Sequence, residues 1–303
     1  MRELAHVKSG VLAAVVAYTL WGILPIYWKA LQSVPALEIM SHRTVWSLAF
    51  VLILLAARQQ WAWIRRVREH PRTLLTFVGS ACLLGLNWTT YIWAVNAGHV
   101  VDSSLGYFIN PLVSVLLGVL FLRERLRPWQ GVAIGLAAAG VVFLTVGLGA
   151  FPWIALTLAG TFGFYGLLRK TAPLGSLEGL SLETALLSIP TLAYLIVLEI
   201  SGTASFVHAG PSTSLLLALT GVVTAFPLLM FAYAARHVRL ATVGILQYIA
   251  PTLQFLLGVL VYHESFTQTR LFGFAAIWLA LLIYSCEGLL VERRRRAGRL
   301  PAG

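Results

Sequence analysis

The chain alternates between long apolar blocks and short polar connectors. Each block runs for about twenty residues, which is the length that an α-helix needs to cross a hydrocarbon core of about 30 Å. Backbone that faces lipid must satisfy its own hydrogen bonds, and the alternating pattern of a membrane β-strand is absent from the sequence. The pattern predicts ten transmembrane helices, over residues 10–29, 36–57, 73–95, 101–122, 129–147, 150–168, 182–200, 212–234, 241–262 and 270–290.

Composition agrees with this pattern and limits the class of protein. Hydrophobic residues make up 59% of the 303 residues and charged residues only 11%, whereas soluble domains carry about 25% charged residues. The connectors leave no room for a large soluble domain. The net charge of +11 does not indicate a nucleic-acid partner, because the Arg residues sit in short loops between apolar blocks. The fold class that we expect is an all-α membrane protein.

Lys and Arg are distributed unequally between alternate connectors. The sequence has 22 Lys and Arg residues. Nineteen of them lie at the two ends of the chain or in the connectors that follow even-numbered helices. Two lie in the other connectors, and Arg43 lies inside a helix. Positive charge marks the cytoplasmic side. We therefore expect a multi-pass protein of the bacterial inner membrane with both termini in the cytoplasm. The basic tail, residues 292–303, is expected to contact anionic lipid headgroups.

Two segments of the chain resemble each other at an offset of 140 residues. Residues 106–124 and 246–264 share the run Leu-Leu-Gly-Val-Leu and the prolines Pro111 and Pro251. These segments are the expected fourth and ninth helices, which cross the membrane in opposite directions because they are five helices apart. An inverted repeat of this kind is typical of alternating-access transporters.

The repeat divides the chain into two five-helix halves, residues 8–147 and 148–291. The matched segments end on Glu124 and Glu264, for which we expect a structural role. In the expected fifth helix, Gly131 and Gly135 form a Gly-x-x-x-Gly motif that favours close helix contact. We expect that contact within the subunit, and the sequence leaves open whether the protein is a monomer or a homodimer.

The sequence also resembles the RarD-type branch of the EamA family, in the drug/metabolite transporter superfamily. The resemblance covers about residues 8–291 and implies ten helices in two inverted halves around a central substrate path. It implies no particular substrate. The segments that carry it are WGILPIYWK (21–29), EIMSHRTVWS (38–47), NWTTYIWAVNAGHVVDSSLGYFINPL (87–112), LGVLFLRERL (117–126), YGLLRK (165–170) and QYIAPTLQFLLGV (247–259).

Polar residues inside the expected helices are candidates for substrate binding. Asn87 and Tyr91 share a face of the third helix at i,i+4. Their side chains need hydrogen-bond partners inside a bilayer. Two interpretations stay open, because such residues either bind a cargo or join helices to one another.

The fourth and ninth helices carry a second polar set beside the matched prolines. Tyr107 and Asn110 precede Pro111, and Gln247 precedes Pro251. A proline inside a helix kinks it and frees a carbonyl one turn earlier, and broken helices at matching positions indicate a transport site. We expect these residues to line a cavity whose freed carbonyls accept donors such as an ammonium or amide group. Packing kinks are the plainer alternative.

Further candidates come from aromatic and charged positions. Gln254 shares a face with Gln247, and Trp21, Tyr165 and Tyr248 are aromatic candidates for substrate contact. Three charged or titratable residues of the second helix are candidates for gating or coupling, namely Glu38, His42 and Arg43. A charge within a membrane helix is a hypothesis of function by default. The alternative is a structural clamp near the outer surface, in which Arg43 pairs with Glu38 or reaches toward water.

No motif for catalysis, metal or a cofactor occurs in the sequence. It has no phosphate-binding loop, no His-Glu-x-x-His and no Gly-x-Ser-x-Gly. Cys82 and Cys286 have no neighbours at metal-ligand spacing. We therefore expect a secondary transporter, an exporter of a small polar or amphipathic metabolite or drug. The alternative is an intramembrane enzyme that acts on a lipid-linked substrate near the outer face, around Glu38 and His42.

The charge distribution makes the topology testable with reporter fusions. Fusions after residues 66 and 295 are expected to be active as cytoplasmic reporters, and fusions after residues 100 and 206 as periplasmic reporters. A tail that reports a periplasmic location would contradict the even number of helices.

Overall fold

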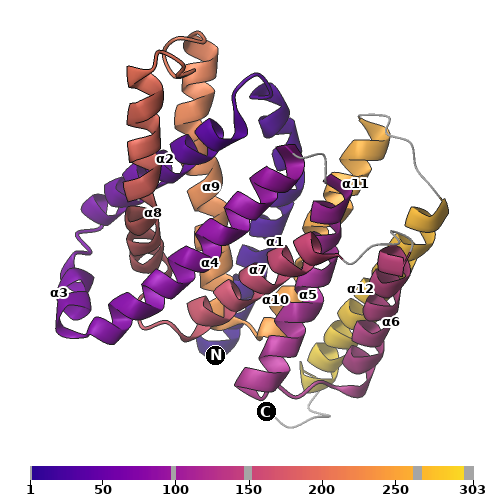
Figure 1. Ribbon diagram of the computed structural model, residues 1–303. Coiled ribbons are helices and arrows are strands. Elements are labelled where there is room, and N and C mark those ends of the chain that lie inside the picture. The colour runs from indigo at the N-terminus through magenta and orange to yellow at the C-terminus, as the bar shows by residue number, and fades with distance from the viewer. Residues whose placement is uncertain (1, 97–99, 147–151, 262–267, 297–303) are drawn as a thin grey trace.

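The computed structural model describes residues 2–96, 100–146, 152–261 and 268–296, which form helices and no strand. The helices form one bundle (Figure 1). Their bounds are α1 Arg2–Ala30, α2 Ala36–Ala57, α3 Ala62–Glu69, α4 Pro71–Asn96, α5 Val100–Leu122, α6 Pro128–Val146, α7 Trp153–Thr171, α8 Ser176–Ile200, α9 Pro211–His237, α10 Leu240–Leu246, α11 Ile249–Leu260 and α12 Gln268–Arg296.

Six of the described helices are long and apolar enough to cross a membrane. They include most of α1, α2, α6, α8, α9 and part of α12. The apolar part of α5, Gly106–Leu122, is shorter. The other expected crossings are α4, α7 and the α10–α11 pair. Helices α4 and α7 carry polar residues such as Asn87 and Thr161, and the pair is interrupted. The prediction of ten crossings therefore stays a prediction.

Helix α3 is a short element that the hydrophobic pattern did not predict. Its eight residues carry three arginines, and its side chains are half-buried or exposed. Arg65 pairs with Glu69 one turn later at 2.6 Å. A helix so short and so charged cannot cross a hydrocarbon core, so it lies at the end of the bundle between α2 and α4 (Figure 1).

The expected ninth helix is divided into α10 and α11 at Gln247 and Tyr248. The backbone stays bonded through this break by tighter turns, in which Tyr248 N donates to Ile245 O and Ala250 N to Gln247 O, both at 3.2 Å. The expectation of a free Gln247 carbonyl is therefore wrong. The missing N–H of Pro251 is accommodated by the break, because the helix restarts just before the proline.

Glu124 has the structural role that the repeat predicted for it. Its two carboxylate oxygens accept the backbone N–H groups of Leu240 and Ala241 at 2.8 and 3.0 Å. Both N–H groups lie at the start of α10, where the helix itself provides no acceptor for them. Lys170 adds a contact at 3.8 Å. The loop after α5 is thus attached to the other half of the chain. The matching Glu264, and the tail beyond residue 296, lie outside the described residues.

A fully buried ion pair joins α4, α7 and α8. Arg169 lies 3.7 Å from Glu183, and both side chains are essentially inaccessible. Glu183 also accepts hydrogen bonds from Ser80 at 2.5 Å and from Tyr165 at 3.2 Å. Arg169 donates to the carbonyl of Ser176 at 2.9 Å. Because each charge has several partners, the pair fixes the relative positions of the three helices.

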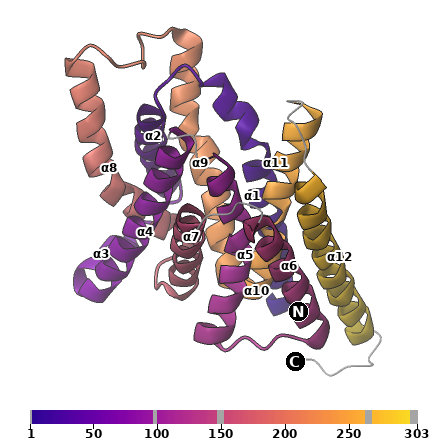
Figure 2. The same ribbon diagram turned by 45° about the vertical axis from the view of Figure 1, so that its right-hand side comes forward.

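The two halves interleave instead of packing side by side. Helix α1 packs on α9 and α11, while its expected counterpart α7 packs on α4 and α5; likewise α2 packs on α9, and α8 packs on α4. Helices that the predicted repeat makes equivalent also meet each other, in the pairs α2–α8, α5–α10 and α6–α12. The start of α1 and the end of α12 lie at the same end of the bundle in both views (Figures 1 and 2).

Glycines permit the closest of these contacts, but not where the Gly-x-x-x-Gly motif indicated. A Cβ at Gly131 or Gly135 would meet no atom within 4 Å. The expectation of close packing within the subunit at this motif is wrong, because this face of α6 points outward. At Gly221 of α9, by contrast, a Cβ would lie 2.3 Å from the backbone carbon of Trp46 in α2.

This contact gives a stability prediction. Gly221→Ala forces α9 away from α2, and overpacking of this kind costs about 1–3 kcal/mol. We expect a lower apparent melting temperature for the purified protein in detergent. Gly131→Ala is the matched control, because it adds the same methyl group at an open position and gains about 1 kcal/mol of helix propensity. Equal melting temperatures for the two variants would contradict this packing.

Candidate functional site

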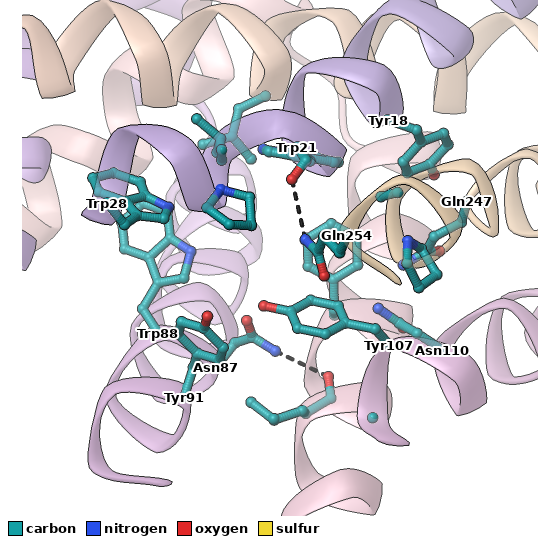
Figure 3. A pocket seen from close by; sticks show the side chains of 18 of the residues that line it. Tyr18, Trp21, Trp28, Asn87, Trp88, Tyr91, Tyr107, Asn110, Gln247 and Gln254 are labelled. Carbon is teal, nitrogen blue, oxygen red and sulfur yellow. Dashed lines mark hydrogen bonds between the residues drawn. The ribbon is translucent and has the colours of Figure 1, made fainter. Parts of the chain in front are cut away.

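A cavity of about 160 Å³ lies where the two halves meet. Figure 3 shows side chains from several helices converging on it. From the first half, α1 provides Tyr18, Trp21, Leu24, Pro25 and Trp28, α2 provides Arg43, α4 provides Asn87, Trp88 and Tyr91, and α5 provides Gly106, Tyr107 and Asn110. From the second half come Leu158, Phe162 and Leu228 of α7 and α9, and Gln247, Ala250, Pro251 and Gln254 of the α10–α11 segment.

Most of the candidates predicted from the sequence lie in this wall. The members are Trp21, Arg43, Asn87, Tyr91, Tyr107, Asn110, Gln247, Pro251 and Gln254. They come from helices far apart in the chain, so the fold brings together the polar positions of α1, α2, α4, α5 and the α10–α11 break. Pro111 itself is buried next to the cavity-lining Asn110 and is not part of the wall.

Asn87 joins two helices and also lines the cavity, so the role in helix contact is observed and the role in cargo binding stays a prediction. Its side-chain nitrogen donates to the carbonyl of Leu158 and to the hydroxyl of Thr161, each at 2.9 Å (Figure 3 shows the first bond). These bonds join α4 to α7. The same residue lines the cavity. Its amide nitrogen is therefore engaged in helix contact, while the side chain also forms part of the wall.

Asn110 is buried in the wall with an unused acceptor. It is 4% exposed, and its Oδ1 has no hydrogen-bond partner within the part of the chain that the structure describes. A buried polar atom without a partner costs free energy. Because Asn110 lines the cavity, its amide lies beside a guest that would occupy it. Gln254 of α11 donates to the carbonyl of Trp21 at 3.1 Å and so joins α11 to α1 (Figure 3).

Aromatic rings form much of the remaining wall. The rings of Tyr91 and Tyr107 meet edge to face with centroids 5.9 Å apart. Trp21 contacts Tyr18 at 5.6 Å and Phe162 at 5.8 Å. Such walls combine flat apolar faces with a polar edge on each Tyr and Trp ring. The cavity therefore suits a guest with both an apolar body and hydrogen-bonding groups.

Arg43 lies at the cavity and not in the pairing expected for a clamp. Its Nε donates to the hydroxyl of Thr224 at 3.2 Å, and its guanidinium lies over the rings of Trp28 and Trp88, 5.2 and 4.7 Å from their centroids. Glu38 is not its partner. The expectation that Arg43 pairs with Glu38 is wrong, because Arg43 turns inward between α1, α4 and α9.

Glu38 and His42 lie outside the cavity wall. Both carboxylate oxygens of Glu38 are engaged by Ser205, which donates its backbone N–H at 2.6 Å and its hydroxyl at 2.8 Å. His42 lies 3.9 Å from Glu38 and packs against Phe206, with ring centroids 4.9 Å apart. These contacts attach the α8–α9 connector to the start of α2. They fit a structural clamp, the alternative that the sequence left open.

Two aromatic candidates lie in the packed interior instead of at the cavity. Tyr165 donates to Glu183 in the buried ion cluster, and Tyr248 donates to the carbonyl of Phe108 at 3.1 Å and is fully buried. Tyr165 lies one turn beyond the cavity-lining Phe162 along α7, and Tyr248 directly follows the cavity-lining Gln247 in the chain.

Four aromatic residues of the wall were not predicted from the sequence, namely Tyr18, Trp28, Trp88 and Phe162. Helical spacing would have identified the first three. Trp28 follows Trp21 by seven residues, which is two turns, and Trp88 precedes Tyr91 by three. Residues at these spacings share a helix face. Within the described residues, no group of three His, Cys, Asp or Glu side chains is arranged to hold a metal ion.

Comparison with known proteins identifies the family. Residues 8–146 match the EamA-like transporter family. The chain is 48% identical to Protein RarD of Streptomyces exfoliatus, over 97% of this chain and 93% of that one. It is 47% identical to an uncharacterized transporter of Vibrio cholerae, over 96% and 97% of the two chains.

A solved crystal structure has the same fold. It superposes with a TM-score of 0.70 at 21% identity and covers 94% of this chain and 98% of the other. This chain has long apolar helices, and its relatives include bacterial transporters. It is therefore a multi-pass bacterial membrane transporter. The chain belongs to the RarD-type branch of the EamA-like transporter family.

Proposed function

We propose that the protein is a secondary transporter that exports a small polar or amphipathic metabolite or drug across the inner membrane by alternating access. One observation carries the proposal. The cavity with its polar and aromatic wall lies between the two halves of the chain and takes side chains from both. A binding site at the interface of two repeats is the arrangement on which alternating access depends.

The packing of the helices supports two inverted five-helix repeats, residues 8–147 and 148–291. Contacts of α1 with α9 and α11 have counterparts in those of α7 with α4 and α5. Pairs such as α2–α8 and α6–α12 join equivalent helices, as expected near a two-fold axis. Both termini in the cytoplasm agree with the common end of α1 and α12 (Figure 1). In this proposal membrane lipids surround the bundle, and the protein is a monomer or a homodimer.

The size of the cavity favours a small cargo. A volume of about 160 Å³ is comparable with an engineered protein cavity that accepts benzene. Drug-sized ligands occupy pockets of about 300–1,000 Å³. A larger cargo would require that the halves separate further than they do in this conformation.

The enzyme alternative needs paired catalytic groups near one membrane face. The residues available for it were Glu38 and His42, with Arg43. Glu38 is held by Ser205 in a loop contact, and Arg43 faces the cavity instead. This geometry favours transport over catalysis.

The experiment is a flux assay in proteoliposomes loaded with a panel of small metabolites. We expect at least one compound to cross faster than in protein-free liposomes. Asn110→Ala is then expected to weaken its binding about ten- to a hundredfold, because a hydrogen bond of about 1–3 kcal/mol is lost. Ser188→Ala is the control, since this buried hydroxyl of α8 bonds to Thr184 within its own helix.

Unchanged affinity and rate in Asn110→Ala, at matched reconstitution, would remove the centre of the proposed site. Equal losses in both variants would indicate a general effect on folding.

A further inference from the structure

The cavity wall carries one charge. Of the described residues that line it, Arg43 is the only Lys, Arg, His, Asp or Glu side chain. The rest of the wall is apolar, aromatic or neutral and polar. In a site removed from bulk water, the field of a single cation acts on any guest with little screening.

The guanidinium is held firmly by three helices. Trp28 of α1 and Trp88 of α4 present their rings to it at 5.2 and 4.7 Å, and Thr224 of α9 accepts from its Nε at 3.2 Å. Aromatic faces attract a cation without neutralising it. The side chain is thereby fixed in position while its charge stays available.

No acidic side chain compensates this charge within the described residues. The ion pairs that they form involve other cations, and Glu38, the acid nearest in sequence, is engaged by Ser205. Arg169 offers a direct comparison in the same bundle. That arginine is fully buried, and it has Glu183 at 3.7 Å and the accepting carbonyls of Gly175 and Ser176 beside it. Among the described residues, Arg169 thus has a counter-ion and Arg43 has none.

We propose that the cavity binds a small organic anion, whose carboxylate or similar group pairs with Arg43 while its apolar body lies against the aromatic wall. A guanidinium presents two parallel N–H donors to a carboxylate, and such pairs are among the strongest hydrogen bonds in proteins. The neutral amides Asn110 and Gln254 surround the rest of the guest. A cationic cargo would be repelled by Arg43. This inference rests on the proposed function, because it names the cargo class of the same cavity.

The test uses three probes of one shape and different charge: benzoate, benzamide and benzylammonium. Each is added to the purified protein in detergent at constant ionic strength, and the apparent melting temperature is measured against probe concentration. Benzoate is expected to stabilise the protein, and the neutral and cationic probes are not. Arg43→Gln is expected to weaken benzoate binding about ten- to a hundredfold, and Arg43→Lys less, because it keeps the charge and loses the paired donors.

Arg65→Gln is the matched control, since this arginine is exposed on α3 and should leave benzoate binding unchanged. The proposal is overturned if benzoate does not stabilise the wild-type protein, if benzamide stabilises it equally, or if Arg43→Gln keeps wild-type affinity. If Arg43→Gln fails to fold, Arg43→Lys and the comparison of the three probes on the wild-type protein still test whether the cavity binds an anion.

The two proposals fail separately. Benzoate binding that depends on Arg43, without flux of any compound in proteoliposomes, would leave the anion site and remove the transport function. Flux of a neutral or cationic compound that is unaffected by Arg43→Gln would leave the transport function and remove the anion site.

Discussion

Each polar side chain in the interior of this bundle needs a hydrogen-bond partner within the protein, because the surroundings offer little water. The structure meets this need in three regions. Glu183 holds Arg169, Ser80 and Tyr165 together in one cluster. Glu38 fixes a loop, and Glu124 fixes the start of α10. These contacts join elements far apart in the sequence. Within the described residues, buried polar atoms without a hydrogen-bond partner remain at the cavity, at Oδ1 of Asn110, and also in these regions, at Nε of Arg169 and Nε2 of His42.

The helices follow from the sequence because apolar length is a local property. The same is true of the polar candidates in the cavity wall, since Asn87, Tyr107, Asn110 and Gln247 are conspicuous within apolar helices. What local patterns cannot give is the partner of a side chain. Glu38 bonds to Ser205, which is 167 residues away, and no spacing rule indicates that contact. Helical periodicity does indicate Trp28 and Trp88, once Trp21 and Tyr91 are taken as references.

The differences from expectation have physical causes. A kink at Pro251 was expected to leave a free carbonyl, but the chain breaks the helix and bonds that carbonyl in a tighter turn. Close packing was expected at Gly131, yet that face is open, while Gly221 accepts the backbone of α2. In both places the packing of distant helices decides the outcome. From the sequence we expected a cavity that accepts hydrogen-bond donors. The position of Arg43 favours a guest that brings a negative charge instead.

In the proposed alternating access, the cavity opens in turn to the two sides of the membrane. Alternating access is tested most directly by cysteine accessibility, in a background where Cys82 and Cys286, both exposed, are replaced by Ser. Asn110→Cys is treated with a membrane-impermeant maleimide, from outside in spheroplasts and from inside in inverted vesicles. If access alternates, the cysteine at position 110 is expected to react from both sides. Reaction from one side only, or from neither, would contradict alternating access.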